Sequence, residues 1–166
     1  MDADKLLKVA DDYSGTAASA RALLVAAGQL FESGKVAEAQ AGFEKFVGQY
    51  SGHPLMSQAK LGIAVCLHSQ GKTNEAAVAF KEVVDRFTGE QTATPAKFYL
   101  ASLYEAQGKP EMARDLFMDL ARTSQTTFGQ QAMARLNDMF QKNPQLRPGA
   151  VSPPPVTLPP ATSATP

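Results

Sequence analysis

Cys66 and His68 are a thiol and an imidazole that stand close together in the sequence, and such a pair could serve a reactive cysteine or a metal site. The surrounding segment predicts a helix, on which residues two positions apart point about 200° away from each other. The two side chains therefore cannot share a proton or a metal ion. We expect Cys66 to be a small buried hydrophobe and His68 to lie on or beside an exposed helix face.

The stretch QGKT, from Gln70 to Thr73, resembles the end of a phosphate-binding loop, which requires a glycine five residues before its Gly-Lys pair. Cys66 occupies that place, and Gly-Lys occurs again at 34–35 and 108–109. A dipeptide that recurs at a regular distance indicates a structural turn. The chain also shows no carboxylate pair, zinc-type His-Glu spacing, calcium loop or glycine-flanked serine, so we expect no enzyme, no cofactor and no metal site.

The recurring Gly-Lys belongs to a repeat with a period of 37 residues. Within 58–87 its marks are Ala64, Gly71, Ala76, Phe80 and Phe87. One period earlier stand Ala27, Gly34, Ala39, Phe43 and Tyr50, and one period later stand Ala101, Gly108, Ala113, Phe117 and Ser124. Of these ten residues only Ser124 differs in type, since it stands where the other units have an aromatic residue. A fixed period of this size predicts a solenoid of stacked units.

Each unit is expected to be two helices folded back on each other. Ala64 is small, so the partner helix can come close, and Gly71 stands where the chain reverses and a left-handed residue is commonly needed. Ala76 and Phe80 belong to the apolar stripe of the second helix. Such a hairpin cannot bury its apolar faces alone, so neighbouring units must cover them.

This order of a small residue, a turn glycine, an alanine and an aromatic residue resembles the tetratricopeptide repeat, whose usual unit is about 34 residues. The unit here is longer, and the prolines that the family places between units stand at Pro54 and Pro95. The resemblance implies an all-α fold, a right-handed solenoid of antiparallel helix hairpins with about eight helices. In overall character the long units also resemble the bacterial membrane-anchored helper proteins of the Sec translocon and of the Tol-Pal and cell-division machinery.

The repeat divides the chain into six segments. Because YSG at 13–15 repeats YSG at 50–52, the amino end reads as the second helix of an incomplete unit. We therefore expect the chain to be a fragment, and the helper proteins suggest a membrane anchor upstream. The segments are 1–15, the truncated unit; 16–52, 53–89 and 90–125, three full repeats; 126–142, a capping helix; and 143–166, a disordered proline-rich tail.

The bulk composition excludes some partners. Sixteen basic residues balance sixteen acidic ones, so nucleic acid and anionic membranes are not expected partners. A single cysteine excludes an internal disulfide. No run of 18 or more apolar residues occurs, so we expect no direct membrane insertion by this chain. The helper-protein resemblance implies the periplasmic side of a bacterial inner membrane, with the cytoplasm as the alternative.

In tetratricopeptide proteins the first helix of each unit lines the inner face and contacts partner peptides. The resemblance assigns this groove to Arg21, Leu24, Gly28 and Phe31 in the first unit, Gln58, Leu61, Val65 and His68 in the second, and Phe98, Ser102 and Glu105 in the third. The apolar members could instead pack against neighbouring first helices. A clamp for acidic chaperone tails is not expected, because the places that need lysine, asparagine or arginine hold Leu24, Gly28, Leu61 and Gly62.

These features predict a scaffold or adaptor that binds an apolar or amphipathic segment of a partner protein in the groove, as an accessory factor of envelope secretion or assembly. The proline-rich tail would tether the module or recruit a second partner. The alternative is a module that self-associates through its truncated first helix or its cap, near which four methionines gather: Met112, Met118, Met133 and Met139.

Overall fold

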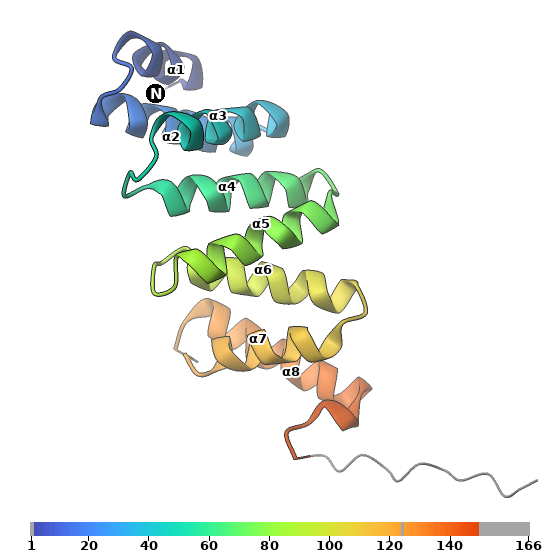
Figure 1. Ribbon diagram of the computed structural model, residues 1–166. Coiled ribbons are helices and arrows are strands. Elements are labelled where there is room, and N and C mark those ends of the chain that lie inside the picture. The colour runs from blue at the N-terminus through green and yellow to red at the C-terminus, as the bar shows by residue number, and fades with distance from the viewer. Residues whose placement is uncertain (1, 124, 150–166) are drawn as a thin grey trace, which may run out of the picture.

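The computed structural model describes residues 2–123 and 125–149 (Figure 1). Within them lie eight α-helices and one short 3-10 helix, and no strand. The elements are α1 (Ala3–Asp12), α2 (Ala17–Glu32), α3 (Val36–Gln49), α4 (Met56–Ser69), α5 (Thr73–Arg86), α6 (Ala93–Ala106), α7 (Pro110–Ala121), α8 (Thr127–Lys142) and η1 (Pro144–Leu146). The predicted all-helical repeat fold is confirmed.

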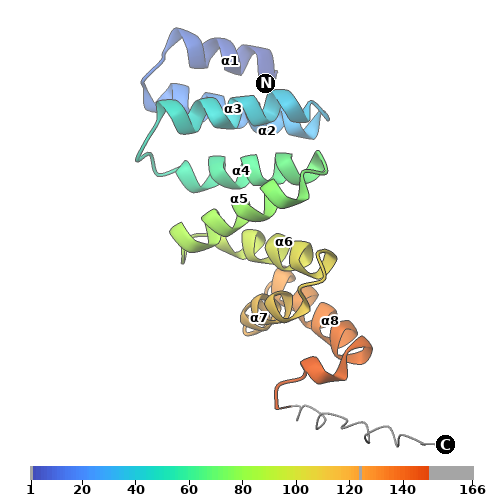
Figure 2. The same cartoon turned by 45° about the vertical axis from the view of Figure 1, so that its right-hand side comes forward.

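The helices form a single stack in which each packs on the next along the chain, with α1 and α8 at opposite ends (Figures 1 and 2). We call α2, α4, α6 and α8 the first helices and α1, α3, α5 and α7 the second helices. The first helix α2 packs directly on α4, and α6 packs directly on α8. The first helices thus provide neighbouring surfaces along one side of the stack.

The three predicted turn glycines have the backbone conformation that the sequence implies. Gly34, Gly71 and Gly108 have φ of +78°, +74° and +70°, where a β-carbon would be strained. At Gly71 the next residue closes the turn, as the N–H of Lys72 donates to the carbonyl of Leu67 at 3.0 Å. The same bond joins Lys35 to Leu30 and Lys109 to Tyr104, each at 2.9 Å. All three hairpins therefore have the same turn geometry. In each, this backbone hydrogen bond caps a carbonyl that has no partner within its helix.

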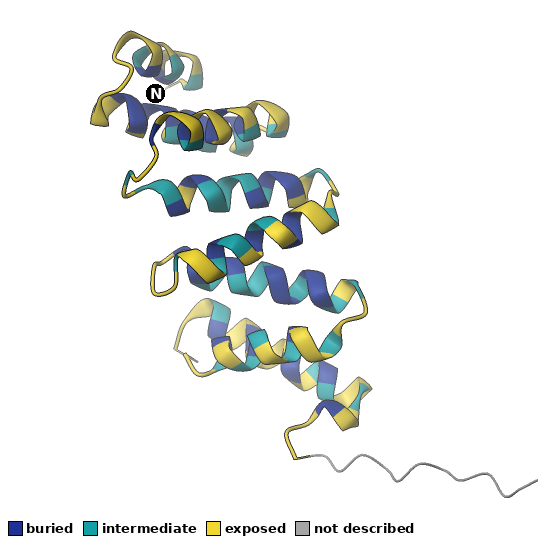
Figure 3. Cartoon of the chain, in the orientation of Figure 1, coloured by how far each residue is buried: buried dark blue, intermediate teal, exposed yellow. Residues whose placement is uncertain are grey.

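The core lies between the two helices of each hairpin and between hairpins (Figure 3). The small residues Ala27, Ala64 and Ala101 are fully buried, and so are the large rings of Phe80 and Phe117. The buried residues form two clusters, one on α1 to α4 and one on α4 to η1. Helix α4 contributes to both clusters and connects the two halves of the core.

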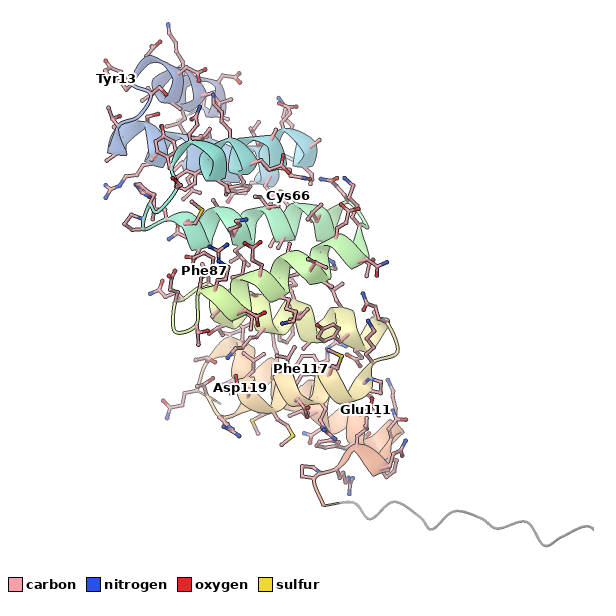
Figure 4. The ribbon with its side chains drawn as sticks, in the orientation of Figure 1. Tyr13, Cys66, Phe87, Glu111, Phe117 and Asp119 are labelled. Carbon is pink, nitrogen blue, oxygen red and sulfur yellow. The ribbon has the colours of Figure 1, made fainter. Side chains whose placement is uncertain are left out.

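The amino end of the stack is stabilised through a buried hydroxyl. Tyr50 is 8 % exposed, and its Oη lies 2.7 Å from the Oγ of Ser19 on α2. Ser19 in turn donates to the carbonyl of Ala10 on α1 at 2.6 Å. Tyr13, one period before Tyr50, is 60 % exposed at the outer end of the stack (Figure 4). The two YSG copies therefore differ in burial.

At the other end, α8 caps the stack. Asn137 lies 36 residues after Ala101 and is exposed on α8, whereas the three full units bury an alanine at the corresponding place. Beyond α8, Leu146 of η1 is buried against the core, and the Nη1 of Arg114 lies 3.5 Å from its carbonyl oxygen. Regular structure thus continues past 142, where we expected the tail to begin. The expected disorder of 150–166 lies outside the described residues.

None of the described helices combines the length and the apolar character that crossing a membrane requires.

Replacing Phe80 with alanine tests the packing inside the second hairpin. Phe80 is fully buried, so Phe80→Ala is expected to lower the free energy of unfolding by about 3–5 kcal/mol, measured by urea titration. Val78 on the same helix is 71 % exposed, so Val78→Ala should change it by no more than about 0.5 kcal/mol. Equal losses in the two variants would contradict the packing described here.

Candidate functional site

The predicted groove residues all keep some contact with solvent. Three of them are exposed, namely Arg21, Gln58 and His68. Seven are half-buried: Leu24, Phe31, Leu61, Val65, Phe98, Ser102 and Glu105. Gly28 is half-buried as well. The face that these residues share is therefore accessible to a partner.

The first and second units bring their groove residues together in one hollow, which we call the α2–α4 hollow. It has a volume of about 280 Å³, and its apolar lining includes Phe31, Leu61 and Val65. Gly62 also lines it and must be glycine, because a β-carbon there would come within 2.6 Å of the Phe43 ring. Phe43 of α3, Glu32, Gln58 and Gly28 complete the lining. Leu24 and Arg21 lie on α2 outside this lining.

The third unit uses part of its groove face for contacts within the chain. Phe98 packs against the rings of Phe117 and Phe128, with centroids 5.7 and 5.5 Å away. The Oγ of Ser102 donates to the carbonyl of Phe98 at 3.0 Å, and Glu105 pairs with Arg135 of α8 at 3.7 Å. Phe98 also borders a hollow of about 430 Å³ with Gln131, Ala134 and Arg135, so the face of α6 and α8 is more polar than the hollow at α2 and α4.

Cys66 and His68 lie on different sides of α4, as the sequence predicted. Cys66 is fully buried in the amino-terminal cluster (Figure 4), whereas the exposed His68 ring packs near the rings of Phe80 and Tyr99. Over residues 2–123 and 125–149, no group of three or more histidine, cysteine, aspartate or glutamate residues is placed to hold a metal ion.

Sequence reasoning missed a larger hollow of about 500 Å³ at the α3–α4 loop, where Lys60 and Arg86 contribute charge. Both cations pair with Glu82, at 3.1 and 2.9 Å. Burial of Glu82 opposes its ionisation, but the hydrogen bonds from these two cations outweigh it and lower the pKa of the carboxyl. Lys97 and Asp119 stand one period after Lys60 and Glu82 and form the same ion pair. Figure 4 labels Asp119 on α7. The 37-residue spacing of these four residues indicates structural ion pairs between neighbouring helices rather than a ligand site.

A further hollow of about 260 Å³ lies on the second helices α5 and α7, over α6. Tyr104 and Leu116 line it, and Met112 at its edge is 46 % exposed. The sequence indicated a methionine-rich region that includes Met112. It did not show that Met112, Tyr104 and Leu116 surround a hollow, because the two second helices belong to different units.

The burial of Cys66 governs its acidity. Burial, and secondarily the negative charge of Glu44, raises the pKa of the Cys66 thiol to about 11. A thiol with this pKa is protonated at neutral pH and is a poor nucleophile. Cys66 is therefore a structural residue.

Alkaline titration tests this assignment. In the unfolded chain the thiol should lose its proton near its ordinary pKa of about 8.5, whereas the folded chain keeps it until about pH 11. The unfolded state then binds fewer protons, so stability should fall as pH rises from about 8.5 to 11. In urea titrations the loss should be smaller for Cys66→Ala than for the parent chain. Identical pH profiles would contradict the raised pKa.

Comparison with known families supports the repeat. Two profiles described as tetratricopeptide repeat match residues 24–91 and 96–124, which together span more than half of the chain. No curated protein matches the chain, so the resemblance to bacterial helper proteins stays a prediction. Tetratricopeptide repeats support a role as a scaffold for protein–protein interaction and are generally non-catalytic. With its helix boundaries, turn glycines and matched residues, the chain belongs to the tetratricopeptide repeat superfamily.

Proposed function

We propose that this chain is an adaptor whose first-helix face binds an apolar or amphipathic segment of a partner protein. The observation that carries the proposal is the α2–α4 hollow, where Phe31, Leu61 and Val65 leave apolar surface accessible. Burying such surface is favourable by roughly 25 cal/mol per Å². A groove between helices is a common receptor for a peptide segment.

The same proposal places the adaptor in envelope protein secretion or assembly, on the periplasmic side of a bacterial inner membrane. Its support is the long repeat unit, which resembles that of the membrane-anchored helper proteins of the Sec translocon and of the Tol-Pal and cell-division machinery. The expected recruiting role of the proline-rich tail belongs to the same proposal.

Affinity capture from bacterial membrane and periplasmic extracts tests the groove. Leu61 is half-buried at the hollow, so Leu61→Glu puts a charge that is costly to bury where the partner would bind. We expect a partner that the parent chain retains to be lost with Leu61→Glu. The matched control is Val78→Glu, which places the same charge on an exposed second-helix position.

Circular dichroism and thermal unfolding must show that both variants remain folded. If Val78→Glu also loses the partner, or if Leu61→Glu retains it, the partner does not bind in the groove.

Self-association is the second candidate function. Tyr13 beside α1 is 60 % exposed and Met133 on α8 is 46 % exposed, so each end of the stack presents an apolar side chain. Light scattering over a range of concentrations should then show a rising mass that Tyr13→Ser combined with Met133→Gln suppresses. A constant monomer mass at high concentration would eliminate this candidate.

A further inference from the structure

The middle of α2 carries a glycine, Gly28, that packing within the chain does not explain. A glycine inside a helix costs about 0.5–1 kcal/mol relative to alanine. Close packing explains three other helical glycines. A β-carbon at Gly42 would lie 3.0 Å from the β-carbon of Ala27, and one at Gly62 or Gly129 would clash with the Phe43 ring or the Thr123 carbonyl. A β-carbon at Gly28 would meet nothing within 4 Å.

The space above Gly28 is the α2–α4 hollow. Gly28 shares this hollow with Phe31, one turn along α2, and with Leu61 of α4. The volume of about 280 Å³ lies just below the range of roughly 300–1,000 Å³ that pockets for small molecules have. The hollow suits one or two bulky apolar side chains better than a complete small molecule.

Two charged residues on α2 flank the hollow, and they indicate the secondary structure of the partner segment that would supply the apolar side chain. Arg21 and Glu32 are both exposed, and neither forms an ion pair with another described residue. They stand eleven residues apart on one helix, so about 16 Å separates them at a rise of 1.5 Å per residue. A helix about 10–12 Å across with its side chains fits between them, so charged residues on its two flanks could reach both.

We propose, on the basis of the groove function above, that the α2–α4 hollow receives a bulky apolar side chain from an amphipathic α-helix that crosses α2 and α4. Gly28 determines how large this side chain is, because the missing β-carbon leaves room for it. Acidic residues on one flank of the partner helix face Arg21, and basic residues on the other flank face Glu32.

Synthetic peptides provide the test. The probes are amphipathic helical peptides of about 18 residues, five turns, with glutamates on one flank and lysines on the other. One central apolar position is alanine, leucine, phenylalanine or tryptophan. Fluorescence anisotropy with the full chain should show affinity that rises with the size of this residue.

Gly28→Met fills the hollow from the protein side. It should weaken the phenylalanine and tryptophan peptides by about tenfold or more and leave the alanine peptide nearly unchanged, so that the size preference is lost. Gly48→Met is the matched control, because Gly48 is also helical and without a neighbour within 4 Å of a β-carbon, but it is exposed on α3 away from the hollow. It should keep the size preference. Methionine favours helices more than glycine does, so neither variant should be less stable to heat.

The outcomes separate this inference from the proposed function. If Leu61→Glu weakens every peptide while Gly28→Met preserves the size order, the groove binds helices and the role of Gly28 is overturned. If no peptide binds the parent chain, the inference of a helical partner is overturned, while the groove function is still judged by the affinity capture. If the peptides bind and Leu61→Glu has no effect on them, both proposals are overturned. Equal affinity for a peptide with its charged flanks exchanged would overturn the orientation set by Arg21 and Glu32.

Discussion

The structure depends on the close approach of the two helices in each hairpin. Ala27, Ala64 and Ala101 are buried completely, and opposite Ala27 even a β-carbon on Gly42 would come within 3.0 Å. At this distance a larger residue would separate the helices and disturb the buried rings beside them. Since the small residues hold each pair together, the opposite face of every first helix remains available to neighbouring units or to a partner.

The groove is uneven because the units use that available face differently. On α2 and α4 the larger side chains stand apart around two glycines and leave a hollow, whereas on α6 the ring of Phe98 is already packed against Phe117 and Phe128. The ion pair between Glu105 and Arg135 also occupies polar groups on the surface between α6 and α8. The amino-terminal half of the stack therefore offers apolar contact and the other half mainly polar contact, which would give a bound segment a preferred direction.

Much of the fold could be predicted from the sequence, because the same residue types recur at a constant period and therefore form the same turns and helix contacts in each unit. Glycines at 34, 71 and 108 mark three reversals, and each has the expected positive φ. The burial of Leu146 could not be predicted, since no repeat partner exists for η1. For the candidate site, the period indicated which helix faces are accessible. It could not show that Phe31 and Leu61 share a hollow, because that depends on how far apart neighbouring units sit.

The way the core is divided has a mechanical consequence. Helix α4 belongs to both buried clusters, while on the inner side α2 packs on α4 and α6 packs on α8. Helices α4 and α6 meet directly through the rings of His68 and Tyr99, whose centroids lie 5.9 Å apart, and α5 packs on both helices. Nearest-neighbour stacks of this kind deform by small rotations at their interfaces. Because each helix packs mainly on its two neighbours along the chain, small rotations shared among the successive interfaces would change the curvature of the inner face and adjust it to the length of a bound segment.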